Sequence, residues 1–72
     1  MKKTYKLQDL DCANCARKMQ DAIARIDGVD DVTVNFLTQK MTITLPEERE
    51  EEILTQAAKV CRRIEPDCRI LF

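Results

Sequence analysis

The alternation of apolar and polar residues along the chain predicts four β-strands. In a strand that is buried on one face only, apolar side chains recur at every second position. This period occurs in four stretches of the sequence: residues 4–8, 32–36, 41–45 and 68–72. Leu37, Thr38 and Gln39 separate the second stretch from the third. We expect these two strands to form an antiparallel hairpin, although their connection contains no glycine.

Two longer stretches have the period of an amphipathic helix. From Ala13 to about Asp27, apolar residues recur at steps of three and four, and Gly28 follows as a helix-ending C′ glycine would. A second helix is predicted after Pro46, with acidic residues in its first turn and Pro66 beyond its end. The residues expected to be buried are Ala16, Met19, Ala22, Ile23 and Ile26 in the first helix and Ile53, Ala57, Val60, Cys61 and Ile64 in the second.

The order of these elements is typical of an α+β fold, the ferredoxin-like βαββαβ sandwich. In that fold both helices cover one face of a four-stranded antiparallel sheet. The 72 residues are predicted to form a single domain, residues 1–72, with a small core. The loop after the first strand and the turn after the second helix can then lie at the same end of the molecule. We therefore expect residues 9–12 to neighbour the turn at residues 64–66.

The composition argues against several classes of function. The formal net charge is −1, and the chain has one Tyr, two Phe and no Trp. It therefore lacks the basic face and aromatic platform that nucleic-acid binding requires. No apolar run approaches the roughly 18 residues of a membrane span, and no signal-peptide pattern follows Met1. We expect a soluble, cytoplasmic domain, either free or part of a longer membrane protein.

Cys12 and Cys15 are the residues whose spacing suggests chemistry. Two residues separate them, at the point where a loop enters the first predicted helix. A helix N-terminus stabilises thiolates and lowers thiol pKa values, so this pair is predicted to be a low-pKa dithiol. In a reducing compartment, such a pair is more typical of soft-metal binding or redox chemistry than of a structural disulfide. With only two strong ligands nearby, the site is expected to be open and suited to metal transfer.

Asp11, directly before Cys12, affects which metal the pair would bind. Two thiolates alone suit a linear or trigonal Cu(I) ion. An added carboxylate raises the coordination number and suits Zn(II), Cd(II) or Pb(II). Asp11 alternatively caps the helix or shapes the loop. We favour a ligand role, so the predicted metal site comprises Asp11, Cys12 and Cys15, with no catalytic residue.

Three other residues are expected to be structural. Cys61 and Cys68 fall on apolar positions of their elements and are predicted to be buried small hydrophobes. Cys61 is a candidate third sulfur only if it approaches the loop. Leu10 is expected to insert into the core and to pin the loop that carries Asp11.

The stretch Asp9-Leu10-Asp11-Cys12-Ala13-Asn14-Cys15 resembles the heavy-metal-associated (HMA) domains, as do Gly28-Val29 and Val34-Asn35-Phe36 further along. The resemblance covers essentially the whole chain. These βαββαβ modules occur as copper chaperones and as N-terminal domains of P-type metal-transporting ATPases, with the signature Gly-Met-Thr-Cys-x-x-Cys. Here Asp11 replaces the Thr, and Asp-Cys-x-x-Cys-Ala looks like the zinc-, cadmium- and lead-exporting ATPases. The turn at residues 64–67 also lacks the Gly-Tyr or Gly-Phe of copper domains.

The resemblance implies that Asp11, Cys12 and Cys15 bind Zn(II), Cd(II) or Pb(II). It also implies that the domain, which is not itself an enzyme, delivers the ion to a metal-exporting P-type ATPase or regulates it. That ATPase would be the same chain or a separate one. The alternatives are a Cu(I) metallochaperone, a thiol–disulfide oxidoreductase and a purely structural interaction module. An exposed two-thiolate site also invites a metal-bridged dimer.

Overall fold

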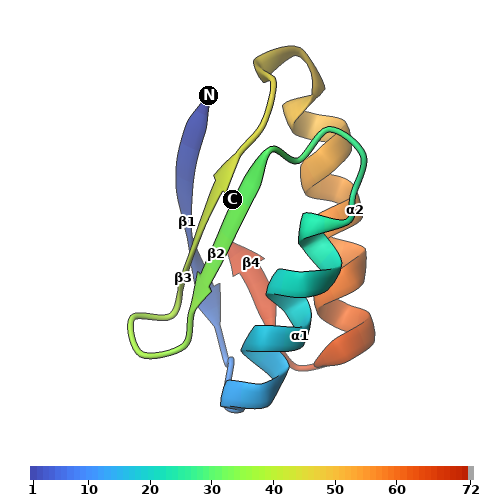
Figure 1. Ribbon diagram of the computed structural model, residues 1–72. Coiled ribbons are helices and arrows are strands. Elements are labelled where there is room, and N and C mark those ends of the chain that lie inside the picture. Colours follow the sequence, from blue (N-terminus) through green and yellow to red (C-terminus); the bar gives the residue numbers. More distant parts are fainter. Residues whose placement is uncertain (72) are drawn as a thin grey trace.

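The computed structural model describes residues 1–71 and has the predicted ferredoxin-like arrangement (Figure 1). The four strands form one antiparallel sheet in the order β2-β3-β1-β4, and both helices pack on the same face of it. Phe72, the predicted last position of the fourth strand, lies outside the described residues. The elements are β1 (Lys2–Gln8), α1 (Ala13–Ala24), β2 (Asp31–Asn35), β3 (Lys40–Thr44), the 3-10 turn η1 (Glu47–Arg49), α2 (Glu50–Ile64) and β4 (Arg69–Leu71).

The core lies between the sheet and the two helices. On β2 and β3, buried Val32, Val34, Met41 and Ile43 alternate with residues that are exposed or half-buried, as the period of two predicted. Each helix contributes one buried stripe. The buried helical residues are Ala16, Met19 and Ile23 in α1 and Ile53, Leu54, Ala57 and Cys61 in α2.

The edges of the two helical stripes differ from the prediction. Ala22, Ile26, Val60 and Ile64 were expected to be buried and are half-buried, so they lie at the margin of the core. Leu54 is 8% exposed, although it was not among the expected core residues. No helix within residues 1–71 is long and apolar enough to cross a lipid bilayer.

The end of α1 was predicted wrongly. The helix ends at Ala24, so it does not extend to Asp27, and Gly28 is not its C′ residue. The N–H groups of Arg25 and Ile26 bond to carbonyl groups three residues earlier, at 3.2 Å and 3.0 Å. Such 3-10 bonds tighten and finish a helix. Gly28 adopts a φ of +99° in the following turn, so it shapes that turn and does not cap the helix.

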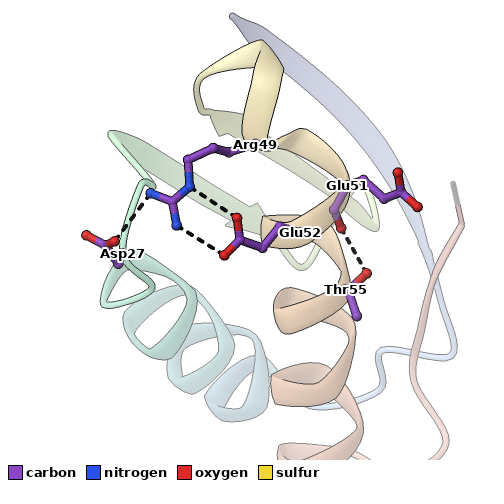
Figure 2. Close-up of polar contacts among 5 residues, drawn as sticks. All are labelled: Asp27, Arg49, Glu51, Glu52 and Thr55. Carbon is purple, nitrogen blue, oxygen red and sulfur yellow. Dashed lines mark hydrogen bonds and ion pairs between the residues drawn. The ribbon is translucent and has the colours of Figure 1, made fainter.

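Arg49 connects the α1–β2 turn to the start of α2 (Figure 2). Its guanidinium group lies 3.3 Å from the carboxylate of Asp27 and 3.2 Å from that of Glu52. A Cβ on Gly28 would lie 2.7 Å from Nη1 of Arg49 and 2.8 Å from Cδ1 of Ile53. The close packing of these two side chains therefore leaves no space for a side chain at Gly28. Because η1 precedes α2, the second α-helix starts one turn later than predicted.

Three connections lie together at one end of the molecule (Figure 1). They are the β1–α1 loop, the β2–β3 turn and the α2–β4 turn. Gln8, Asp9, Asp11, Pro66, Asp67 and Arg69 line a hollow of about 510 Å³ at this end, which confirms that the first loop neighbours the last turn. Leu10 is 1% exposed. Its side chain inserts into the core and pins the first loop, as predicted.

Candidate metal centre

Cys12 and Cys15 lie together at the N-terminus of α1. Cys12 is the N-cap residue of this helix, and its Sγ accepts a hydrogen bond from the backbone N–H of Cys15 at 3.2 Å. It thus takes the place of the Ser, Thr or Asp that more often accepts such an N–H. This N–H has no carbonyl partner within the helix, and it and the positive end of the helix dipole both favour negative charge on the sulfur of Cys12. Both cysteine side chains are half-buried.

The two thiols have pKa shifts of opposite sign. The pKa of Cys12 is lowered, first because the thiol of Cys15 donates a hydrogen bond to it and next because the backbone N–H of Cys15 does so. The pKa of Cys15 is raised to about 11, first because its proton is held by Cys12 and next because of burial. The prediction of a low-pKa dithiol is therefore correct for Cys12 and wrong for Cys15. Once Cys12 ionises, the two sulfurs hold one proton between them.

Glu65, the C-cap residue of α2, lies beside the two thiols. Its negative charge opposes ionisation of both Cys12 and Cys15, and its side chain acts to raise the pKa of Cys15. The fold expected from the sequence already predicted that this turn neighbours the loop before the thiols. The carboxylate itself was not among the predicted site residues, because no sequence motif links Glu65 to the cysteine pair.

Asp11 lies next to the thiols along the chain, on the exposed side of the loop. Its side chain is exposed and lines the hollow described above, together with the carboxylates of Asp9 and Asp67. Within residues 1–71, no three side chains of the Cys, His, Asp and Glu types converge closely enough to hold a metal ion. The structure therefore brings Cys12 and Cys15 together, and ligation by Asp11 stays a prediction.

Cys61 and Cys68 are core residues, at 1% and 0% exposure, as predicted. The thiol of Cys61 donates a hydrogen bond to the carbonyl oxygen of Cys68 at 3.4 Å. Burial is the largest cause that raises both pKa values, that of Cys68 to about 12. Protonated thiols that are buried in this way are inert and contribute to packing.

The family of the chain is decided by a sequence match over most of its length. A model of the heavy-metal-associated domain matches residues 4–66. The chain belongs to this family. The sequence-based assignment to the HMA domains is thereby confirmed. Members of this family are small metal-binding modules without catalytic activity of their own.

Two related sequences are cation-transporting ATPases. This HMA domain is 32% identical over 66 residues to the "Cadmium, zinc and cobalt-transporting ATPase" of Bacillus subtilis (strain 168). The matching region covers 92% of this chain and 9% of the ATPase. It is 40% identical over 40 residues to the "Zinc/cadmium/lead-transporting P-type ATPase" of Escherichia coli (strain K12), which covers 56% of this chain and 6% of that protein. The chain thus spans less than a tenth of either relative.

Two solved structures have the same fold. One is the CopZ metallochaperone, with a TM-score of 0.75 and 14% identity over 99% of this chain and 100% of that one. The other is the N-terminal domain of a potential copper-translocating P-type ATPase from Bacillus subtilis. It has a TM-score of 0.73 and 20% identity over 96% of this chain and 84% of that one. At such identities the likeness concerns the fold alone.

Proposed function

We propose that this HMA domain binds a divalent soft metal ion, Zn(II), Cd(II) or Pb(II), through Asp11, Cys12 and Cys15. The ion is cargo. The domain either delivers it to a metal-exporting P-type ATPase of the same or another chain, or regulates that ATPase. The observation that carries the proposal is the thiol pair at the start of α1, where Cys12 is poised to ionise and Cys15 retains a removable proton. The proposed location is the cytoplasm, where both thiols stay reduced.

The charges around the thiols favour a divalent ion over a monovalent one. With Asp11, Cys12 and Cys15 as ligands, a divalent ion gives a complex with a net charge of −1, whereas the same ligands leave a Cu(I) complex with a net charge of −2. Glu65 lies beside the sulfurs, and Asp9, Asp11 and Asp67 line the adjoining hollow. Nearby carboxylates repel the more negative Cu(I) complex more strongly, and oxygen ligands suit the harder divalent ions.

The proposed transfer is an exchange of ligands at an open site. The thiolate of Cys12 binds the incoming ion first, and the ion then displaces the proton of Cys15, which passes to solvent. A thiolate or carboxylate of the partner adds to the bound ion, and the ligands of this chain leave in turn. The shared intermediate is a metal bridge between two proteins, of which a metal-bridged dimer of this domain would be the simplest form.

The test is metal titration of the reduced protein in the absence of oxygen, with Zn(II), Cd(II) and Cu(I) each in competition with a chelator. Asp11→Asn removes the charge of the proposed ligand with little change in shape, and Asp9→Asn is the matched control from the same hollow. We expect one tight equivalent of Zn(II). Its affinity should fall by about tenfold or more in Asp11→Asn, as for loss of a group that supports a metal site, and stay within about twofold in Asp9→Asn, where only screened charge is lost.

A Cu(I) metallochaperone is the second candidate, favoured by the two sulfurs that lie together at the start of α1. Two sulfurs are a sufficient ligand set for Cu(I). Weak Zn(II) binding, tight Cu(I) binding and no effect of Asp11→Asn would establish this candidate and refute the divalent site. Equal losses of Zn(II) affinity in Asp11→Asn and Asp9→Asn would show that Asp11 acts through its charge and not as a ligand.

A further inference from the structure

Gln39 is the last residue of the β2–β3 turn. Both ends of its side-chain amide bond to the backbone of the β1–α1 loop, residues 9–12, which we call the metal-binding loop because it carries Asp11 and Cys12 of the proposed site. Its Oε1 accepts a hydrogen bond from the N–H of Leu10 at 3.1 Å, and its Nε2 donates to the carbonyl oxygen of Leu10 at 2.7 Å. Nε2 also donates to the carbonyl oxygen of Phe36 at 2.8 Å. The backbone carbonyl of Gln39 accepts the N–H of Leu7 at 2.7 Å. One residue thus joins β1, the metal-binding loop and the β2–β3 turn.

The backbone on both sides of this contact is in an unfavourable conformation. Asp9 has a φ of +60° and Gln39 a φ of +54°, and they are the two non-glycine residues with positive φ within residues 1–71. The left-handed region is unfavourable for residues with a Cβ and persists only where the surroundings hold it. A glycine would adopt this turn without strain. The turn itself therefore does not require glutamine at this position, and what glutamine adds over glycine is its side-chain amide.

Leu10 is held in two independent ways. Its side chain is 1% exposed in the core, and both of its backbone polar groups are paired with Gln39. Asp11 and Cys12 directly follow Leu10 in the loop, so the fixed backbone of Leu10 limits the positions that these two residues can take. Cys15 lies on α1, one helical turn beyond Cys12, and does not depend on this contact. The conformation of the loop before Cys12 is thus set by a residue from a different part of the chain.

We propose that Gln39 is a positioning residue for the metal centre. By fixing the peptide groups of Leu10, its amide holds Asp11 and Cys12 in the arrangement that binds the ion. This inference rests on the proposed metal-binding function. A loop that is already ordered loses less conformational freedom on binding, and such preorganisation mainly slows dissociation. Without the Gln39 amide, metal release should become faster while the rate of association changes little.

Gln39→Gly is the variant that tests this role, because it removes the amide and also relieves the positive φ. Asn35→Ala is the matched control. The Oδ1 of Asn35 accepts the N–H groups of Leu37 and Thr38 at 2.9 Å and 3.1 Å in the same turn and makes no hydrogen bond to the metal-binding loop. Gln39→Glu is a second variant, which keeps an acceptor for the N–H of Leu10 and loses the donor to its carbonyl oxygen.

The measurements are amide hydrogen exchange at Leu10 in the metal-free protein and the rates of Cd(II) association and dissociation. The cadmium–thiolate absorption band follows the ion, with a chelator present for dissociation. In Gln39→Gly we expect faster exchange at Leu10 and about tenfold or more faster Cd(II) dissociation, the effect of losing a group that orients a ligand. Association should change by less than about twofold. Gln39→Glu should show a smaller increase in dissociation, and Asn35→Ala should show none.

Unchanged Cd(II) dissociation in Gln39→Gly, with faster exchange at Leu10, would overturn the inference and leave the proposed function intact. Equal acceleration in Asn35→Ala would overturn it too, because the effect would then belong to the turn as a whole. If Gln39→Gly does not fold, Gln39→Glu decides between the same outcomes. Failure of the wild-type protein to bind Cd(II) would refute the proposed function, and with it this inference.

Discussion

Metal binding by this domain should release protons in a number that depends on pH. Cys12 has a lowered pKa, and Cys15 has one raised to about 11. Metal ions bind to thiolates, so any proton still on either sulfur must leave. Cys15 carries its proton at all physiological pH values and loses it whenever both sulfurs bind the ion. Cys12 loses a proton only below its own pKa, since above that pH it is already ionised.

The magnitude follows from the count of protons. At pH 7, a pKa of about 11 leaves roughly one Cys15 thiol in ten thousand ionised. Release of the Cys15 proton alone therefore raises the apparent affinity about tenfold for each pH unit. Below the pKa of Cys12 the second proton raises this to about a hundredfold for each unit. The slope of log affinity against pH should thus fall from two towards one as the pH rises through the pKa of Cys12.

Competition titrations with Cd(II) at constant ionic strength, from pH 6 to 8.5, give this slope directly. Calorimetry in buffers of different ionisation enthalpy gives the number of protons independently. Cys15→Ala should remove one proton from the count. It should also move the pKa of Cys12 back towards its ordinary range, because the thiol of Cys15 makes the largest contribution to lowering that pKa. A slope below one would show that Cys15 is already ionised before the metal binds. A slope of two at pH 8.5 would show that Cys12 is still protonated at that pH. Either result refutes the reasoning.

Two further predictions concern single residues. Gly28→Ala should reduce the free energy of unfolding by about 2–4 kcal/mol, because a Cβ is strained at a φ of +99° and must displace Arg49 and Ile53. Urea denaturation measures this reduction, and a value below about 0.5 kcal/mol would contradict the packing around Gly28. Iodoacetamide at neutral pH should modify Cys12 first, because of the thiols in residues 1–71 it alone has a lowered pKa; peptide mass spectrometry identifies the site, and first modification of Cys15 would reverse the assignment of the thiolate.

The secondary structure was predictable because burial in this fold follows simple periods. In β2 and β3, every second side chain faces the helices, so alternation identified the strands. The helix ends were less predictable, because local hydrogen bonds decide them. Gly28 suggested a helix cap, but the 3-10 bonds of Arg25 and Ile26 finish α1 before that residue. A glycine in the sequence indicates a positive φ without saying which turn requires it.

The candidate site was predictable to the extent that it is local in sequence. The spacing of Cys12 and Cys15 placed both sulfurs at the start of a helix, where the structure has them. The unequal pKa values were not predictable, because they depend on which sulfur accepts the other's proton. Glu65 and Gln39 were missed for a different reason. They come from the α2–β4 and β2–β3 turns. Only the topology of the sheet brings Glu65 near Cys15 and Gln39 to the β1–α1 loop.

The surroundings of the thiols divide into a fixed side and an open side. On the fixed side, Leu10 is buried and its backbone is bonded to Gln39. On the open side, Asp11 lines a hollow with Asp67 from the last turn, and Glu65 reaches Cys15. In the proposed function, the fixed side governs how slowly an ion leaves, and the carboxylates of the open side govern which ion is preferred. Changes to Gln39 should therefore alter the dissociation rates of Zn(II) and Cd(II) by similar factors, whereas changes to Asp11 should alter the preference for divalent ions over Cu(I).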